Sequence, residues 1–388
     1  MASLASSVTP GQQEPQRHSH NGAHSDLLAR QYSCVAHANE IRQGRFRRVS
    51  LQNESILIAR DDRGKLTAFA DVCLHRGSRL ATSEEGDANA IRCPYHGWEY
   101  DAAGCLTYAR LMPRQSSARL PRIDLLEHSG LIFLAFDAQQ REDFGTALDQ
   151  VFGSLGPFGL ETLKVAERLV FSAHAAWPLF VQNFVECYHC YGAHELLRRS
   201  EAFIDFAENG EGWKIGQLDK ATQLRAIDHG KPVMAIEPSS LSPVLRAART
   251  STLSTDSETV DGNLIGKPLG GLPAGDRAFV YGFVGPLTHF TVLPDQLVVF
   301  TFDPVGDDRT DITVTWLVHQ DTSLDEDQKA NMVGFWARTL KEDIALTEAV
   351  QQNANSRFIP KASFASLEHD AKIFTAWLNR HSEEANPQ

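Results

Sequence analysis

Two cysteine–histidine pairs lie close together in the first third of the chain. Cys73-Leu74-His75 is followed by Cys93-Pro94-Tyr95-His96. Two thiolates and two imidazoles are the ligands of a Rieske [2Fe–2S] cluster, in which two histidines replace two cysteines on one iron. Cys73, His75, Cys93 and His96 are therefore the candidate ligands of an electron-carrying cluster.

A structural zinc site is the alternative, because two cysteines and two histidines also suit tetrahedral Zn²⁺. Each pair in this chain mixes one cysteine with one histidine, whereas common zinc modules keep Cys with Cys and His with His. Both pairs also lie in strand-like sequence that is rich in Gly and Pro. The pattern favours the cluster and leaves zinc as the second interpretation.

A second group of metal-binding residue types occurs at Asn183, Glu186, His189 and His194. The first three recur every third residue, so they would share one face of a helix. His194 would point roughly 140° away from His189 on a continuous helix. Both imidazoles can reach one metal only if the helix is broken, and Gly192 would supply the break. The group suits a mononuclear Fe, Zn or Cu ion.

A facial triad also needs a carboxylate, for which Asp343 is the candidate. A long helix is predicted over residues 324–352, and Asp343 interrupts its apolar stripe. That stripe consists of Met332, Trp336, Leu340, Asp343 and Val350. A buried carboxylate is costly unless it is paired or bound to a metal, so we expect metal ligation; a salt bridge to an arginine is the alternative. The side chains of Glu342 and Glu348 are predicted to point away from this apolar stripe, to other faces of the helix.

Two parts of different secondary structure must position these residues. From about 34 to 137, short β-rich runs such as 55–59 and 131–136 alternate with turn signals, which predicts an all-β domain with the cluster loops inside it. From about 138 onward, helix and strand are mixed. Segments 297–302 and 311–318 predict an antiparallel hairpin, and 230–275 is predicted to form mobile loops.

Length and charge limit the class of protein. The 388 residues are enough for two or three domains. A net charge of −12 argues against nucleic acid or an anionic membrane as a partner. No run of 18 apolar residues is present, and residues 1–27 are predicted to be a disordered tail without a signal peptide. Thiolate ligands need a reducing compartment, so we expect a cytoplasmic protein whose six cysteines form no disulfide framework.

The motifs together resemble a known family. Cys73 to Gly77 and Cys93 to Trp98 resemble the Rieske signature of ring-hydroxylating oxygenase α subunits, with Leu74 where many members have Pro. With the later Glu-x₂-His-x₄-His motif and Asp343, the chain resembles the oxygenase component of Rieske non-haem iron oxygenases over about residues 28–382. This resemblance implies an α+β fold. An all-β Rieske [2Fe–2S] domain would cover 28–137, and a helix-grip (START-like) catalytic domain with an antiparallel sheet would cover 138–388.

The resemblance also implies cofactors and partners. The Rieske cluster would be held by the four residues named first, and mononuclear Fe(II) by His189, His194 and Asp343. The subunits would form a homotrimer, in which the cluster of one subunit supplies electrons to the iron of its neighbour. Glu186 matches a position where many members have an Asp that bridges the two sites across the subunit boundary, and Asn183 lies one turn before it. A separate NAD(P)H-dependent reductase of the flavin and ferredoxin type is expected, since the chain has no nucleotide-binding fingerprint.

The glutamate at position 186, within the string Glu-Cys-Tyr-His-Cys, resembles the subgroup that oxidises quaternary ammonium compounds such as carnitine and glycine betaine. The implied reaction is monooxygenation of a small substrate with O₂, with N-demethylation or carbon–nitrogen cleavage as its outcome. Aromatic residues that could surround a cation, or simply pack in the core, are Trp213, Phe279, Tyr281, Phe283 and Phe290. The alternatives are an aromatic ring-hydroxylating dioxygenase α subunit, a Rieske electron carrier and a zinc-stabilised binding protein.

Overall fold

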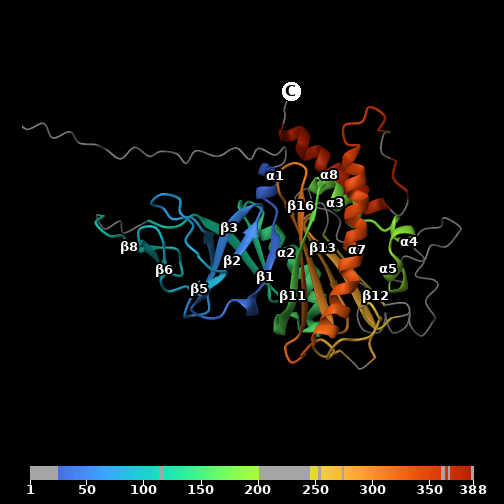
Figure 1. Ribbon diagram of the computed structural model, residues 1–388, viewed down its shortest axis with the longest axis horizontal. Coiled ribbons are helices and arrows are strands. Elements are labelled where there is room, and N and C mark those ends of the chain that lie inside the picture. The colour runs from blue at the N-terminus through green and yellow to red at the C-terminus, as the bar shows by residue number, and fades with distance from the viewer. Residues whose placement is uncertain are drawn as a thin grey trace, which may run out of the picture.

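The computed structural model describes most of the chain. The described residues are 25–112, 118–200, 245–251, 255–272, 275–359, 363–365 and 368–385. Figure 1 shows a β-rich N-terminal part beside a larger part in which helices pack on a second sheet. Of the tail predicted over residues 1–27, the last three residues lie in a short helix, α1 (Ser25–Ala29), and the others lie outside the described residues.

Short strands build the N-terminal part. A seven-stranded antiparallel sheet has the order β1-β10-β9-β4-β3-β2-β5, and a three-stranded sheet has the order β6-β7-β8. The bounds are β1 (Ser33–His37), η1 (Ala38–Glu40), β2 (Arg45–Leu51), β3 (Glu54–Arg60), β4 (Leu66–Ala70), β5 (Glu85–Asp87), β6 (Ile91–Arg92), β7 (Glu99–Tyr100), β8 (Leu106–Tyr108), β9 (Arg122–His128) and β10 (Leu131–Ala135). The strands predicted over 55–59 and 131–136 are confirmed, and their apolar runs are buried.

A six-stranded antiparallel sheet of order β11-β16-β15-β14-β13-β12 forms the centre of the second part. The bounds are α2 (Arg141–Phe152), η2 (Gly153–Phe158), η3 (Leu160–Thr162), β11 (Leu163–Ala173), α3 (Trp177–Phe184), α4 (Cys190–Ala193), α5 (Glu195–Ser200), β12 (Leu245–Ser251), β13 (Ala278–Val284), β14 (Thr288–Val292), β15 (Gln296–Pro304), β16 (Thr310–His319), α7 (Glu326–Gln352) and α8 (His369–Ala385). The predicted hairpin, made by β15 and β16, and the long helix α7 are confirmed.

Each face of this sheet has its own core. On one face, α3, α7 and α8 cover apolar residues such as Phe302 and Trp316. On the other face, α2 and the N-terminal strands cover residues such as Phe290 and Leu317. Period-two alternation along the strands explains why the two sets are separate. The domain boundary predicted near residue 137 falls between β10 and α2, and the core crosses it, because Tyr32 stacks on Phe144 with ring centroids 4.5 Å apart.

Segment 230–275 differs from its prediction where the structure describes it. Residues 245–251 form β12, an edge strand of the central sheet, and Ser257, Glu258 and Thr259 are fully or almost fully buried. The loop prediction is therefore wrong for residues 245–251, which form a strand. Residues 255–272 form no helix or strand, as predicted, but Ser257 and Glu258 are hydrogen-bonded inside the fold rather than solvated.

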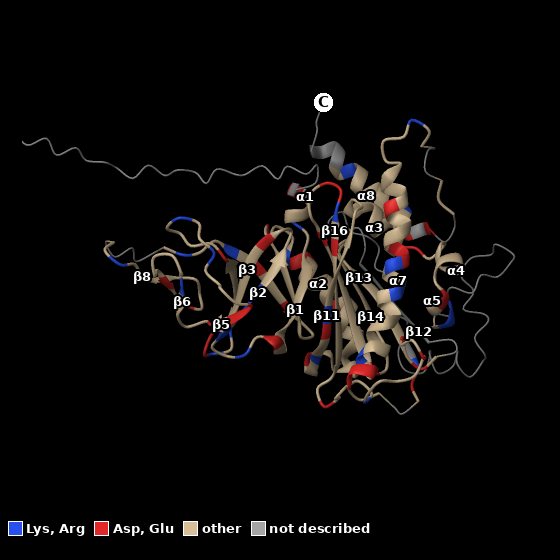
Figure 2. Ribbon diagram, viewed as in Figure 1, with Lys and Arg blue, Asp and Glu red and all other residues tan. Residues whose placement is uncertain are grey.

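Charged residues occupy the solvent-facing side of α7 (Figure 2). The helix begins at a capping box, in which Asp325 and Gln328 exchange hydrogen bonds between side chain and backbone. Val350 is 56% exposed, so the buried stripe of α7 ends before it, contrary to the predicted pattern. No helix in the described part of the chain is long and apolar enough to cross a membrane.

Candidate metal centres

Two similar loops carry the four candidate cluster ligands. The first follows β4, and the second connects β6 with β7. In each loop, the N–H of a glycine donates to the carbonyl of the cysteine four residues earlier: Gly77 to Cys73 at 2.9 Å and Gly97 to Cys93 at 3.0 Å. Both glycines have φ near +70°, a conformation that a side chain would disfavour. The glycines thus allow both chains to turn tightly around one site.

The ligand atoms of these loops converge. Nδ1 of His75 lies 3.1 Å from Nδ1 of His96, and both imidazoles are exposed. Cys73 and Cys93 are each 2% exposed and carry free thiols. Two nitrogens bound about 2.1 Å from one tetrahedral metal lie about 3.4 Å apart, so both Nδ1 atoms can bind a single iron. The donor set therefore fits a cluster with a buried sulfur side and an exposed histidine side.

Tyr100 touches this site and was not identified from the sequence. Its hydroxyl lies 3.3 Å from Sγ of Cys73 and accepts a hydrogen bond from the N–H of Leu74 at 3.1 Å, which leaves its proton for the sulfur. Burial and the neighbouring thiol raise the pKa of Tyr100 above its ordinary value, so it remains a donor. A tyrosine in a short strand carries no sequence signal for this role.

His189, His194 and Asp343 meet at a second site. Nε2 of His189 lies 3.2 Å from Nε2 of His194 and 3.2 Å from Oδ1 of Asp343, and the last two atoms are 3.0 Å apart. Ligands on neighbouring octahedral corners about 2.1 Å from a metal are about 3.0 Å apart. The three atoms therefore fit one triangular face around a mononuclear metal.

The other ring nitrogen of each histidine contacts a glutamate. Nδ1 of His189 lies 2.5 Å from Oε1 of Glu186, and Nδ1 of His194 lies 2.9 Å from Oε2 of Glu342. A carboxylate at Nδ1 keeps the proton there and leaves Nε2 free to bind metal. The prediction that Glu342 points away is wrong, because its long side chain reaches around α7 to the imidazole. The prediction for Glu348 holds, since it accepts from the backbone N–H of His174 instead.

Asn183 lies beside the same atoms. Its Nδ2 is 3.0 Å from Nε2 of His189 and donates to Oδ1 of Asp343 at 3.2 Å. The residues predicted to act together are therefore close in space. They are not on one helix, however, because α3 ends at Phe184. His189 and His194 instead flank the short helix α4, which contains Gly192, so this glycine is not the helix break.

Cys187 and Cys190 form a disulfide across this segment, with Cα atoms 4.9 Å apart. The sequence predicted no disulfide framework, and this single bond between the two cysteines was not expected. Their spacing of three residues in a turn brings the Cα atoms within the range that a disulfide requires. The bond encloses Tyr188 and His189.

Electrostatics favours ionised carboxylates at the second site. Burial alone would lower the pKa of His189, but hydrogen bonds to Asp343 and Glu186 outweigh it and raise this pKa to about 9. Burial would raise the pKa of Asp343, and the two histidines hold it below its ordinary value. Without a metal, a proton therefore occupies the position that a cation would take.

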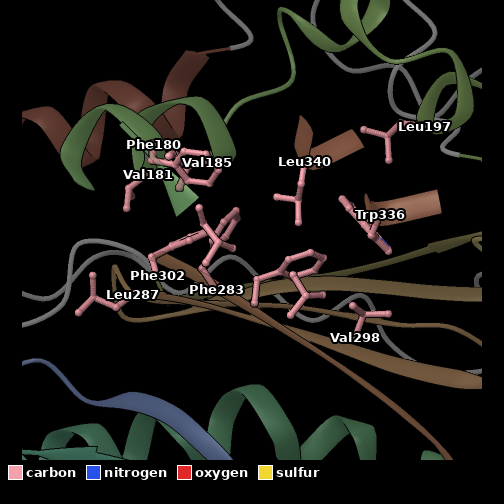
Figure 3. Close-up of a cluster of buried hydrophobic side chains, with 14 of the residues drawn as sticks. Phe180, Val181, Val185, Leu197, Phe283, Leu287, Val298, Phe302, Trp336 and Leu340 are labelled. Carbon is pink, nitrogen blue, oxygen red and sulfur yellow. The ribbon is translucent and has the colours of Figure 1, made fainter. Parts of the chain in front are cut away.

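A cluster of aromatic side chains begins at Phe184, next to this metal site. Phe184 follows Asn183 directly, and its ring packs against Phe300 at 5.3 Å and Trp336 at 6.3 Å. Figure 3 shows Trp336 and Leu340 of α7 above the sheet that carries Phe283 of β13. We call Phe184, Phe283, His289, Phe300 and Trp336 the aromatic wall.

The residues expected around a cation are only partly in this wall. Phe283 belongs to it, and Tyr281 packs against the same core. Phe290 does not, because it lies on the opposite face of β14 and packs against Phe152 at 5.1 Å. His289, its neighbour, faces the wall instead. Trp213 lies outside the described residues.

Two family models match the chain. The model for the ring hydroxylating alpha subunit (catalytic domain) matches residues 160–384, and the model for the Rieske [2Fe-2S] domain matches residues 31–121. The second match identifies the Cys/His loops as a Rieske site rather than a zinc site.

Curated relatives cover most of the chain. It is 30% identical to a glycine betaine monooxygenase oxygenase subunit of Pseudomonas aeruginosa, over 93% of this chain and 86% of the relative. It is 25% identical to the carnitine monooxygenase oxygenase subunit of Acinetobacter baumannii, over 85% and 81%. The large oxygenase component of a 2,4-dinitrotoluene dioxygenase system from Burkholderia sp. is 24% identical, over 87% and 79%.

Solved structures share the fold. The quaternary ammonium Rieske monooxygenase CntA in complex with an inhibitor matches with a TM-score of 0.67 and 22% identity, over 93% of this chain and 91% of that one. Naphthalene 1,2-dioxygenase from Rhodococcus sp. matches with a TM-score of 0.64 and 16% identity, over 94% and 92%. The α+β fold class expected from the sequence is confirmed.

Proposed function

The chain belongs to the family of ring-hydroxylating oxygenase α subunits, and from this premise we propose that it oxidises a small quaternary ammonium compound at a carbon next to the nitrogen. It is the terminal oxygenase component of its system. The aromatic wall beside the mononuclear site carries the proposal. A quaternary ammonium group offers no N–H donor, so aromatic faces are the groups that suit it. The names of the relatives that act on glycine betaine and carnitine support the same substrate class.

The two metal groups have separate places in this proposal. Cys73, His75, Cys93 and His96 hold the [2Fe–2S] cluster, while His189, His194 and Asp343 hold the iron. When bound, the cluster supplies single electrons and the iron supplies activation of O₂. Glu186 and Glu342 fix the imidazole tautomers through Nδ1. Asn183 orients Asp343 from the end of α3.

Electrons reach the iron from a neighbouring subunit in this account. Figure 1 shows β6 and β8 at one end of the long axis and α4 and α5 at the other, so the two sites of one chain are far apart. Apolar surface is exposed at both ends, at Leu74 and Tyr95 beside the cluster and at Tyr188 and Tyr191 beside the iron. We propose that these surfaces meet in a homotrimer, with Glu186 between a cluster histidine of one subunit and His189 of the next.

Other parts of the proposal concern organisation and partners. Residues 28–137 act as the Rieske domain and residues 138–388 as the catalytic domain. The relatives are named as oxygenase subunits, which supports a separate NAD(P)H-dependent reductase as electron donor. A cytoplasmic location is proposed because the thiolates of Cys73 and Cys93 need a reducing compartment.

The proposal is tested by O₂ consumption with a surrogate reductase. Glycine betaine and carnitine should each be compared with an aromatic acid of similar size, and formaldehyde and trimethylamine should be measured as products. We expect uptake that depends on a quaternary ammonium substrate and matches product formation. Uptake that is coupled only to the aromatic acid would instead favour ring hydroxylation.

A further inference from the structure

His289 is a buried polar residue that the metal sites do not use. It exposes 5% of its surface, and its Nδ1 has no hydrogen-bond partner among the described residues. Burial lowers the pKa of this imidazole to about 3, so the ring is neutral and keeps one N–H donor. A buried ring nitrogen without a hydrogen-bond partner costs free energy, and a bound acceptor recovers it in the tautomer that protonates Nδ1.

His289 lies on the face of the sheet that α3 and α7 cover. It pairs with Phe283 on β13 and with Phe300 on β15, so the three side chains form one row across three strands. The ring of Phe184 covers this row, with its centroid 5.0 Å from that of His289. Phe184 directly follows Asn183, which contacts His189 and Asp343 at the metal site. The imidazole of His289 is therefore one aromatic ring, that of Phe184, away from this segment.

The aromatic wall has a second polar contact, at Trp336. Nε1 of Trp336 donates to Oε2 of Glu258 at 2.9 Å, and Thr291 also donates to this oxygen, at 3.4 Å. Glu258 is fully buried. A carboxylate that accepts from the indole N–H makes the ring more electron-rich, which strengthens the attraction of its face for a cation.

The two polar groups of the aromatic wall, His289 and the Trp336–Glu258 pair, are a short distance apart. The ring of Phe300 lies 5.4 Å from His289 and 4.7 Å from Trp336, and that of Phe184 contacts both as well. One aromatic ring, that of Phe300 or of Phe184, therefore separates His289, the neutral donor, from the face of Trp336 that attracts a cation. The ring centroids of His289 and Trp336 are thus no farther apart than the sum of these two distances. A short zwitterion, with its ammonium and carboxylate groups one or two carbons apart, can span this separation when each group contacts one of the two rings.

We propose that the aromatic wall binds a quaternary ammonium carboxylate in one orientation, with the ammonium group on Trp336 backed by Glu258 and the carboxylate accepting a hydrogen bond from His289. This inference rests on the proposed function and adds the residues that determine substrate specificity. A neutral imidazole suits the second role because it donates to a carboxylate without repelling the nearby cation. Phe184 and Phe300 exclude water between the two ends.

Equilibrium binding to the full-length, metal-loaded protein tests the proposal without turnover. The two probes are glycine betaine, which has both groups, and tetramethylammonium, which lacks the carboxylate. His289→Phe keeps a ring but removes the donor, so glycine betaine should bind about 10- to 100-fold more weakly and tetramethylammonium within about twofold of wild type. His289→Gln, which retains an N–H donor, should recover part of the glycine betaine affinity. His319→Phe makes the same change on β16, away from the wall, and should alter neither probe.

Glu258→Gln tests the cation end. This variant keeps an acceptor for the indole N–H and removes the charge, so both probes should bind several-fold more weakly. Thermal unfolding of each variant identifies any loss of fold. If His289→Phe does not fold, His289→Gln and Glu258→Gln test the proposal instead, through the ratio of the affinity for glycine betaine to that for tetramethylammonium.

The outcomes separate this inference from the proposed function. If wild-type protein binds neither probe, the quaternary ammonium assignment itself fails. If wild-type protein binds glycine betaine but His289→Phe binds it equally well, His289 is only a packing residue and the carboxylate contact is overturned. If Glu258→Gln leaves both affinities unchanged, the cation does not lie on Trp336.

Discussion

Nδ1 of His194 lies 2.9 Å from Oε2 of Glu342, while Nε2 of the same imidazole lies 3.0 Å from Asp343, the next residue along α7. Two adjacent carboxylates of one helix therefore contact opposite sides of one ring. Only one of the two can be a metal ligand, because only Asp343 faces the side that His189 also faces. Glu342 instead fixes the orientation of His194.

Glu342→Ala should weaken iron binding without abolishing it. Loss of a carboxylate partner of a ligating histidine typically costs 10- to 100-fold in metal affinity or activity. Metal titration of the iron-depleted protein measures the effect. Glu348→Ala is the matched control on the same helix, since Glu348 contacts a backbone N–H rather than a ligand. Equal affinities for the two variants would show that Glu342 is dispensable.

Asp343→Ala should empty the mononuclear site and leave the visible spectrum of the cluster unchanged. Asp343 is buried and contacts both candidate histidine ligands, whereas the cluster loops belong to a different part of the fold. Iron and sulfide analysis, combined with the absorption spectrum, checks both sites in one preparation. Full mononuclear iron in this variant would place the third ligand elsewhere.

Tyr100→Phe should lower the reduction potential of the cluster. The hydroxyl donates to Sγ of Cys73, and a hydrogen bond to a cluster sulfur stabilises the more electron-rich reduced state. Redox titration of wild type and variant measures the shift. Tyr108→Phe, on exposed strand β8, is the control. A potential that does not fall would mean that the hydroxyl supports only the backbone of Leu74.

The affinity of the empty mononuclear site for Fe(II) should depend on pH. His189 has a pKa of about 9 in the metal-free protein, so a proton must leave before Nε2 can bind metal. The affinity should be nearly constant above pH 9 and fall about tenfold for each pH unit below it. Anaerobic metal titrations between pH 6.5 and 9 check this slope. A flat profile would contradict the hydrogen bonds of His189 to Asp343 and Glu186.

The sequence predicted which residues form the two candidate metal sites better than it predicted the backbone geometry that brings them together. The candidate cluster ligands could be proposed because the pairing of Cys-x-His with Cys-x₂-His is rare and has a defined chemistry. Asp343 could be proposed as a third ligand because a carboxylate interrupted an apolar stripe. Both arguments depend on local pattern, which is the information that a single sequence contains.

The local pattern could not predict contacts between segments that are distant in the sequence. Helical periodicity placed Asn183, Glu186 and His189 together, and they do meet, but through a turn after Phe184 rather than through one helix. Glu258 is buried against Trp336, 78 residues away, although its surroundings have the composition of a loop. Burial of this kind depends on tertiary packing, so neither propensity nor periodicity could indicate it.

The account depends most on Glu186, which is proposed to couple the cluster of one subunit to the iron of the next. Glu186→Gln keeps the volume and removes the charge next to His189. The cluster should still be reduced and the iron should still bind. Transfer of electrons between them should become slower by orders of magnitude.

Single-turnover kinetics of the pre-reduced protein, saturated with glycine betaine and mixed with O₂, measures this transfer directly. The account predicts that wild-type clusters are reoxidised as product forms, whereas Glu186→Gln clusters stay reduced and yield almost no product. Reoxidation of the variant at the wild-type rate, with a normal yield of product, would contradict it.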